Sequence, residues 1–310
     1  MGKVSYILDI GKLGEAYNTK EYSKINSAII NRLKSKSYFI EENGILAAYD
    51  IRKNIPLSTI YSTPVWVVDF LLKDMDILSN TNQEKIIENL LVELKKEIIG
   101  KKGYYTFRVP SKFVDLLTVF NKMFNDSLFC GGNVIYTTEL TTNTKASTIE
   151  EDNRVSIFFA DKDYICQHRE NLIDISEKSF QKYQGQYHIA PFTKTRAGQI
   201  YKNWIKKALE TNEKFPVLVA EFNDEVVGFC TYEETEECYE GVLASVSDKY
   251  RGIGVYNKLI YSYIQLAKEH KKLFVAGTQI DNYVVQRSWI KMGMYPCETV
   301  YLFHYNNLEI

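Results

Sequence analysis

The feature that most constrains the fold is a glycine-containing turn between an apolar run and an amphipathic segment. The run 241–246 ends at Val246, and the turn contains Arg251-Gly252-Ile253-Gly254. The apolar residues that follow recur at helical spacing, which predicts a helix: Val255, Leu259, Ile260, Tyr263, Ile264 and Ala267. Because the first N–H groups of a helix lack intrahelical acceptors and lie at its positive end, the turn suits phosphate oxygens.

The two common nucleotide motifs do not fit this turn. A dinucleotide-binding fingerprint needs a third glycine where the chain has Asn257, and it belongs early in a parallel sheet. A Walker loop continues into Lys-Ser/Thr, whereas Gly254 is followed by Val255 and Tyr256. A plain turn from strand to helix, without a ligand, remains the alternative.

The segment Arg251-Gly252-Ile253-Gly254-Val255-Tyr256 resembles the acyl-CoA loop of the GNAT acetyltransferase superfamily, except that Tyr256 replaces a small residue. The resemblance implies acetyl-CoA as cosubstrate and no metal. It also implies that the N–H groups of this loop bind the CoA pyrophosphate. The preceding strand would open so that the pantetheine arm contacts backbone at Ala244, Ser245 and Val246.

The whole chain reads as two similar halves of an α/β fold with mixed sheets. Each half has hairpin, strand, helix, strand, helix and strand in the same order. The first half has Lys73-Asp74-Met75-Asp76 where the second has its glycine turn. We therefore expect tandem GNAT-like domains: a degenerate one at 1–140, a linker at 141–153 and an acyltransferase domain at 154–310. The expected elements are strands 4–10, 65–72, 104–109, 133–138, 155–160, 239–246, 273–277 and 299–305, hairpins 37–49 and 215–229, and helices 21–34, 81–100 (opened by a capping box at Thr81 and closed by Gly100), 112–123, 200–209, 255–267 and 282–292.

A narrower resemblance concerns the acceptor. Thr278-Gln279-Ile280-Asp281-Asn282 is similar to the Thr-Gln-x-x-Asn motif of dTDP-fucosamine acetyltransferases, and the segments 187–191 and 200–205 are similar to the acceptor side of that family. This resemblance implies a nucleotide-linked amino sugar as acceptor, Gln279 and His188 as substrate residues, and Asn282 as a CoA contact. Alternatively, Gln279 and Asn282 cap a helix, and His188 is a turn histidine.

Two residues bear on mechanism. Trp289 stands at the position of the family's tyrosine acid, and an indole cannot give up its proton at neutral pH. We expect a lower rate rather than no reaction, with water, Tyr283 or Ser288 as alternative donors. Glu240 is the candidate base, or else the exposed side of a half-buried strand. The acidic run 233–237 is interpreted as a solvated hairpin tip.

Composition limits the partners. Lys+Arg total 38 against 39 Asp+Glu, a formal net charge of -1, which gives no electrostatic case for nucleic acid. The five cysteines are scattered, which predicts no disulfide framework or zinc site and a cytosolic chain. No apolar run is long enough for a membrane span, and no signal peptide is recognised. The oligomeric state is left open, a homodimer included.

Three functions follow from these observations. The first is an acetyl-CoA-dependent N-acetyltransferase that acts on a nucleotide-linked amino sugar. The second is a GNAT enzyme for another amine, such as a peptide, an antibiotic or a small metabolite. The third is a non-catalytic acyl-CoA-binding or interaction module, an alternative that Trp289 and Tyr256 leave open.

Overall fold

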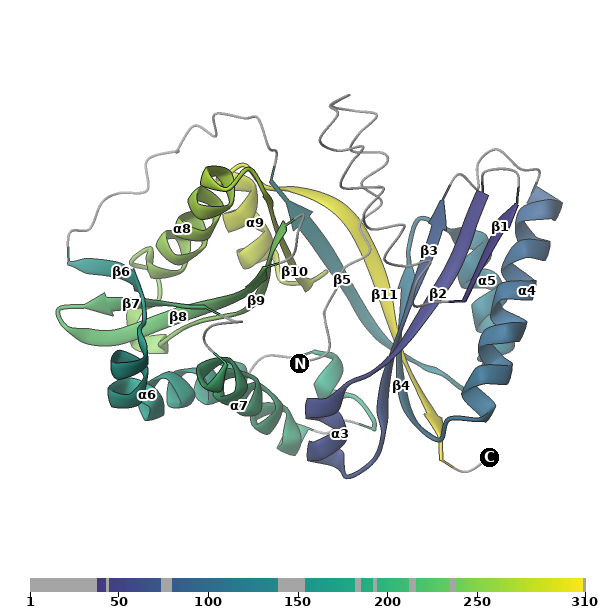
Figure 1. Cartoon of the computed structure of the whole chain (residues 1–310), viewed down its shortest axis with the longest axis horizontal. Helices are drawn as coiled ribbons and strands as arrows, with labels where there is room; N and C mark the ends of the chain where they lie inside the picture. The colour runs from purple at the N-terminus through teal and green to yellow at the C-terminus, as the bar shows by residue number, and fades with distance from the viewer. Residues whose placement is uncertain are drawn as a thin grey trace. The chain divides into compact units, whose positions relative to one another are not determined.

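The computed structural model describes residues 38–42, 45–73, 80–138, 154–181, 185–191, 194–211, 216–234 and 238–308 (Figure 1). The elements expected in residues 1–36 and the linker 141–153 lie outside these residues. The chain forms two compact units, one of residues 1–134 with 297–310 and one of residues 135–296. Each unit is described in turn.

The first unit contains a mixed sheet with helices against one face (Figure 1). Its strand order is β1-β2-β3-β4-β11-β5; β3 and β4, which α4 connects, run parallel, and the pairs β1–β2, β2–β3 and β4–β11 are antiparallel. The strands are β1 Tyr38–Glu42, β2 Ile45–Lys53, β3 Val65–Lys73, β4 Gly103–Pro110, β5 Leu128–Thr137 and β11 Tyr295–Asn307, and the helices are α3 Ile55–Tyr61, α4 Asn80–Ile99 and α5 Val114–Met123.

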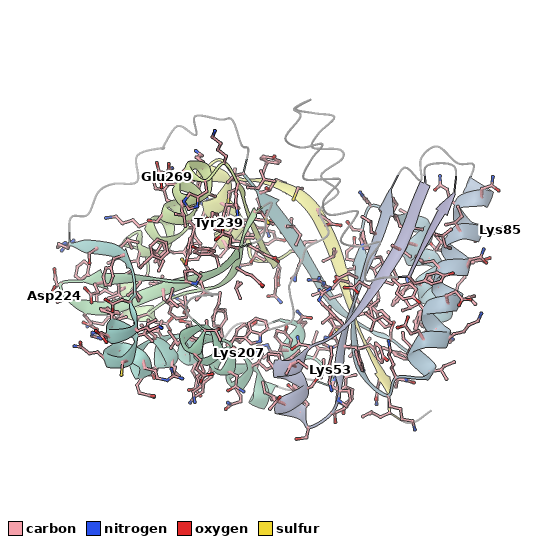
Figure 2. The ribbon with its side chains drawn as sticks, viewed as in Figure 1. Lys53, Lys85, Lys207, Asp224, Tyr239 and Glu269 are labelled. Atoms are coloured by element: carbon pink, nitrogen blue, oxygen red, sulfur yellow. The ribbon has the colours of Figure 1, made fainter. Side chains whose placement is uncertain are left out.

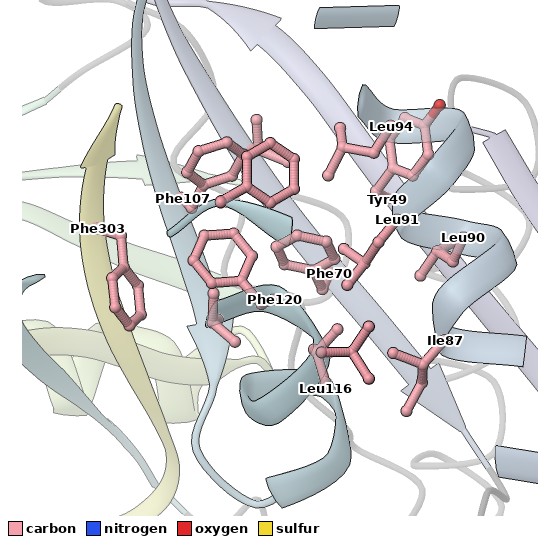
Figure 3. Packing of buried hydrophobic residues seen from close by; sticks show 14 of the residues in the cluster. Tyr49, Phe70, Ile87, Leu90, Leu91, Leu94, Phe107, Leu116, Phe120 and Phe303 are labelled. Carbon is pink, nitrogen blue, oxygen red and sulfur yellow. The ribbon is translucent and has the colours of Figure 1, made fainter. Parts of the chain in front are cut away.

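The core of this unit lies between the sheet and helices α4 and α5 (Figure 3). The ring of Phe107 on β4 lies 5.0 Å from that of Phe120 on α5. From α4, Leu90, Leu91 and Leu94 are all fully buried. This helix fits the sequence prediction because its apolar residues recur at three- and four-residue spacing and so share one face.

The second unit has the strand order β5-β10-β9-β8-β7-β6, with α8 and α9 on one face and α6 and α7 on the other (Figure 1). Its elements are β6 Val155–Phe159, α6 Lys162–Gln181, η2 Gln186–His188, α7 Lys194–Glu210, β7 Val217–Phe222, β8 Glu225–Glu234, β9 Cys238–Val246, η3 Asp248–Tyr250, α8 Val255–Glu269, β10 Leu273–Gln279 and α9 Tyr283–Lys291. On the α8 face, the rings of Tyr232, Tyr239 and Tyr263 pack together, and Tyr239 is labelled in Figure 2.

The two units exchange their last strands. The end of β5 belongs to the second unit, where the Thr138 N–H donates to the Phe274 carbonyl over 3.0 Å and Thr138 Oγ1 accepts from the Phe274 N–H over 2.9 Å. Most of β11, from Cys297 onward, belongs to the first unit and pairs with β4. We expected residues 297–310 with the second half. The division into functional domains at 1–140 and 154–310 stays a prediction.

The mixed α/β architecture and the repeated order of elements are confirmed. Both hairpins form, and the predicted helix after Gly254 begins at Val255. The sequence reading missed α3 and α6. Helix α6 carries charged residues on most of its turns, so its buried residues (Ile165, Leu172, Ile173, Ile175 and Ser176) form only a narrow stripe.

Candidate active site

The glycine turn after β9 depends on the conformational freedom of its two glycines. Gly252 and Gly254 have φ of +85° and +84°, a left-handed conformation that other residues rarely adopt. The first helical hydrogen bond runs from the Lys258 N–H to the Gly254 carbonyl, so the N–H groups of residues 255–257 have no acceptor within α8. A Cβ atom at either glycine would meet nothing within 4 Å. The turn is therefore an open site at the positive end of a helix.

Arg251 lies beside this turn but is not unpaired. Its Nη2 atom lies 2.7 Å from Asp248 Oδ1, and the two side chains are 60% and 50% exposed. Ion pairs this exposed contribute about 0–1 kcal/mol. An incoming anion would therefore compete with Asp248 for the guanidinium at little cost.

Strands β9 and β10 separate beyond Glu240. Their parallel register pairs Glu240 with Val275 and does not continue toward Val246, although both strands are described there. In addition, the register of β8 with β9 shifts between Thr231 and Tyr232, which leaves Val242 as an extra residue in β9. The backbone groups of residues 241–246 that face β10 thus have no strand partner, and this opening leads toward the glycine turn.

Helix α6 contacts the end of β9 from the other face. Ser245 is buried and its Oγ donates to the Ile175 carbonyl over 3.4 Å, while Ser179 Oγ donates to the Val246 carbonyl over 3.2 Å. Ala244 pairs with Cys230 in the β8–β9 ladder. The side chain of Ser245 is thus committed to packing, and what these residues offer a ligand is backbone.

Trp289 is 3% exposed, and its indole Nε1–H donates to the hydroxyl of Tyr256 over 3.1 Å. A second hydrogen bond joins the same two helices, from Ser288 Oγ on α9 to Asn257 Oδ1 on α8. Tyr283 is 73% exposed at the start of α9. The structure therefore joins the two positions at which the sequence departs from the acyl-CoA pattern, Tyr256 and Trp289.

The sequence reading missed Tyr136, which β5 brings from the first half of the chain. Its ring contacts Trp289 edge to face at 5.4 Å between centroids, and its hydroxyl donates to Gln286 Oε1 over 3.2 Å. Burial raises the pKa of Tyr136, so this hydroxyl stays protonated at neutral pH. No local pattern could have found this contact, because Tyr136 and Gln286 are 150 positions apart.

Asn282 occupies the N-cap position of α9, but its side chain makes no capping hydrogen bond. Instead its Nδ2 donates to Thr278 Oγ1 over 2.9 Å, which ties the end of β10 to the helix start. The backbone carbonyl of Gln279 accepts from Gln286 Nε2 over 3.1 Å. The capping role considered for the Asn282 side chain is therefore wrong, and the ligand roles of Gln279 and Asn282 stay predictions.

His188 closes the short helix η2, where its Nδ1 accepts from the Gly185 N–H over 3.2 Å. The neighbouring Tyr187 is buried and contacts the rings of Tyr201 and Trp204 edge to face. These contacts support the interpretation of His188 as a turn histidine, and Tyr201 is buried in the core. A role for His188 in acceptor binding stays a prediction.

Glu240 lies where β9 and β10 separate and is only 5% exposed. The alternative that it marks the exposed side of a strand is therefore wrong. Glu233, which we interpreted as part of a solvated hairpin tip, is 6% exposed and lies opposite Glu240 in the β8–β9 register. Glu233 is buried because β8 continues through Glu233 and Glu234, so the acidic run begins inside the sheet.

The described residues contain no group of three or more His, Cys, Asp or Glu side chains arranged to hold a metal ion. All five cysteines lie within the described part of the chain, and none of them forms a disulfide. Burial raises the pKa of the Cys130 thiol to about 12 and raises that of Cys230 well above its ordinary value, so neither is a reactive thiolate at neutral pH. Among the described helices, none combines the length and apolarity needed to cross a bilayer.

Comparisons with known proteins agree with this geometry. Residues 172–294 match the model of the family described as Acetyltransferase (GNAT) family. None of the curated protein sequences compared with this chain matches it.

Three solved structures share the fold. A GCN5-related N-acetyltransferase from Sphaerobacter thermophilus aligns with a TM-score of 0.55 at 10% identity, over 84% of this chain and 76% of that one. A GCN5-related N-acetyltransferase from Kribbella flavida aligns with a TM-score of 0.52 at 10% identity, over 91% of this chain and 94% of that one. A functionally unknown conserved protein from Staphylococcus epidermidis aligns with a TM-score of 0.52 at 15% identity, over 87% of this chain and 94% of that one. At such identities the likeness concerns the fold alone, but it extends beyond residues 172–294 into the first half of the chain.

Proposed function

We propose that this chain, whose residues 172–294 match the model of the GNAT acetyltransferase family, transfers an acetyl group from acetyl-CoA to the amine of a nucleotide-linked amino sugar. The observation that carries the transfer is the separation of β9 from β10 next to the open glycine turn. A phosphate group at the turn and an extended arm along β9 would bring a thioester to the level of Val242 and Glu240.

The residues present fit an acyl-CoA. The backbone N–H groups at the start of α8, which have no acceptor within the helix, suit a diphosphate, and Arg251 adds a positive charge that is held in an exposed ion pair with Asp248. Unpaired backbone groups in 241–246 suit the amides of a pantetheine arm. A backbone N–H at the Val242 bulge would polarise the thioester carbonyl and stabilise the oxyanion.

In this proposal the amine attacks the thioester carbonyl directly, with both substrates in one cleft. Glu240 takes a proton from the amine. For the leaving thiolate, Trp289 is no donor, Ser288 already donates to Asn257, and Tyr283 is largely exposed. Tyr256 accepts from the indole, which is a donor only, so its own hydroxyl proton is directed elsewhere. We assign the donor role to Tyr256.

The acceptor class rests on the motif Thr278-Gln279-Ile280-Asp281-Asn282 and on the segment at 187–205. A thiol-release assay with acetyl-CoA tests it: dTDP-linked amino sugars are compared with a panel of simple amines, peptides and aminoglycosides. We expect turnover with the sugar nucleotides. Turnover with another amine only would retain the transferase and refute the sugar. The cytosolic location and the homodimeric state of the protein stay predictions.

The second candidate is an acyl-CoA-binding module without turnover. The observation that favours it is the use of the indole at position 289 to hold Tyr256 rather than to face a ligand. Calorimetry that found tight acetyl-CoA binding, with no thiol release on any amine, would support this function over the transferase.

A further inference from the structure

Beyond the residues used so far, β8 and β9 carry a group of buried polar side chains on the face opposite α8. Thr231, Glu233, Glu240 and Ser245 are 1%, 6%, 5% and 4% exposed. Ser245 is accounted for by its hydrogen bond to the Ile175 carbonyl. The other three lie farther along the strands, toward the point where β9 and β10 separate.

Glu233 and Glu240 are direct partners in the antiparallel register. Side chains of such partners project from the same face, and their Cβ atoms are about 4.5–5.5 Å apart. Glu234 and Tyr239, the next pair, project from the other face, where Lys272 Nζ lies 2.6 Å from Glu234 Oε1. Consecutive positions of β8 thus place one carboxylate, that of Glu234, at the surface and the other, that of Glu233, in a buried position.

Thr231 adds a second, independent observation. It lies two positions before Glu233 and so projects from the same face. Its Oγ1 atom is buried and has no hydrogen-bond partner among the described residues. A buried hydroxyl without a partner is unusual in folded proteins, and a ligand or an ordered water can satisfy it.

The position of this cluster relative to the cleft is set by the register of β10. Val275 pairs with Glu240 in the last pair before the strands separate. Alternation along β10 places Gln279 on the same face as Val275. The carboxylate pair thus lies at the closed end of the opening that leads to the glycine turn.

From this arrangement we propose that Glu233, Glu240 and Thr231 form the seat of the acceptor's ammonium group, so that the substrate is an amine bound as its cation. The inference rests on the proposed acetyl transfer and adds Glu233 as a specificity residue. Two carboxylates offer four oxygen acceptors and an ammonium has three N–H donors, so the pair can hold the ligand alongside its contacts within the protein.

The chemistry balances without a further reactant. The bound ammonium gives one proton to the Glu240 carboxylate and becomes a neutral amine. Its nitrogen forms the bond to the thioester carbonyl carbon, the carbon–sulfur bond breaks, and the electron pair leaves with the sulfur. The nitrogen loses its second proton as the amide forms, and the thiolate takes up one proton. Glu233 exchanges no proton in this step.

The test is calorimetry on the full chain, in the presence and absence of CoA, with the diamine putrescine as probe and butanediol as its neutral isostere. We expect saturable binding of putrescine and none of butanediol. Glu233→Gln should weaken putrescine binding about 10-fold or more, because it removes a charged hydrogen-bond acceptor. Thr231→Val keeps the shape of the side chain but removes the hydroxyl, and it should weaken putrescine binding about 2- to 10-fold.

Glu234→Gln is the matched control, since it is the neighbouring residue on the other face, and it should leave putrescine binding unchanged. In steady-state assays with any accepted amine, Glu233→Gln should raise KM for the amine without changing kcat or KM for acetyl-CoA. Three results would each overturn the proposed ammonium site. Butanediol would bind as well as putrescine, putrescine binding would not saturate at millimolar concentration, or the Glu233 and Glu234 variants would lose putrescine affinity equally. If putrescine binding depends on Glu233 but no amine is acetylated, the proposed acetyl transfer is refuted and the proposed ammonium site is retained.

Discussion

The indole N–H of Trp289 and the hydroxyl of Tyr256 form a 3.1 Å hydrogen bond between helices α9 and α8. Each residue alone is a departure from the acyl-CoA pattern of the sequence, and together they form one unit. Tyr136 and the Ser288–Asn257 hydrogen bond flank this pair. The start of α8, which carries the open N–H groups, is thus fastened to α9.

If Tyr256 donates the proton to the leaving thiolate, Tyr256→Phe should lower kcat by about 100-fold, the lower end for general acid catalysis. The loss of one hydrogen bond should also lower the free energy of unfolding by about 1 kcal/mol. Binding of acetyl-CoA should be retained. Rapid-quench assays and urea titrations measure these effects, and Tyr283→Phe, an exposed tyrosine on α9, serves as control. An unchanged kcat in the Tyr256 variant would remove this residue from the mechanism.

Replacing Gly254 tests the turn itself. Gly254→Ala places a Cβ in a left-handed conformation, which costs about 1–2 kcal/mol, although the space around it is open. We expect lower stability and weaker acetyl-CoA binding by calorimetry. Gly198→Ala in α7 is the control, because its Cβ would make ordinary contacts and helices favour alanine by about 0.5–1 kcal/mol. Loss of stability at Gly198 with none at Gly254 would contradict the conformational argument.

The ion pair between Arg251 and Asp248 predicts an increase in affinity. Asp248→Asn releases the guanidinium, and because the pair is exposed, we expect acetyl-CoA to bind up to about fivefold more tightly at low salt. Arg251→Gln should weaken binding. The gain should shrink at high salt, since exposed charges are screened. Tighter binding that does not depend on ionic strength would point to another cause.

In the first unit, Asp69 is buried between Arg108 and Arg52. Burial by itself raises the pKa of the Asp69 carboxyl, but Arg108 and then Arg52 outweigh it and hold the pKa below its ordinary value. A lowered folded-state pKa means that the stabilisation is complete above the unfolded value, near 3.9, and is lost as the pH falls through the folded value. Acid titration of unfolding should show this loss.

Asp69→Asn should remove that acid transition and lower the free energy of unfolding at neutral pH by about 3–5 kcal/mol, because two arginines lose their buried partner. Asp50→Asn is the control. Asp50 lies 3.4 Å from Arg52 and is more exposed, so we expect about 1 kcal/mol or less. Equal effects of the two variants would show that burial does not set the strength of this cluster.

The strand exchange predicts that the second half does not fold alone. A fragment of residues 154–310 lacks the end of β5, so the Phe274 backbone loses both of its hydrogen bonds to Thr138, and β11 loses β4 as its partner. We expect this fragment to lack cooperative unfolding and CoA binding. Coexpression with residues 1–140 should restore both and yield a copurifying pair. Cooperative unfolding of the fragment alone would contradict the exchange.

Local signals determined much of this protein. The left-handed glycines, the turn after β9, both hairpins and most helices depend on residues a few positions apart, so the sequence alone predicts them. The mixed α/β fold was predicted on that basis, whereas the acyl-CoA role of the turn was inferred from its resemblance to the GNAT loop and stays a prediction. Helix α6 was missed because its apolar stripe is narrow and interrupted by charges.

Tertiary structure decided what depends on distant residues. The burial of Glu233 follows from the extension and register of β8, and the partner of Trp289 follows from the packing of α8 on α9. The exchange of β5 and β11 leaves no local trace, because a strand carries the same alternating pattern whichever sheet it joins. Side chains that acquire their chemistry from burial and from a partner far along the chain therefore become recognisable only when the strands are paired.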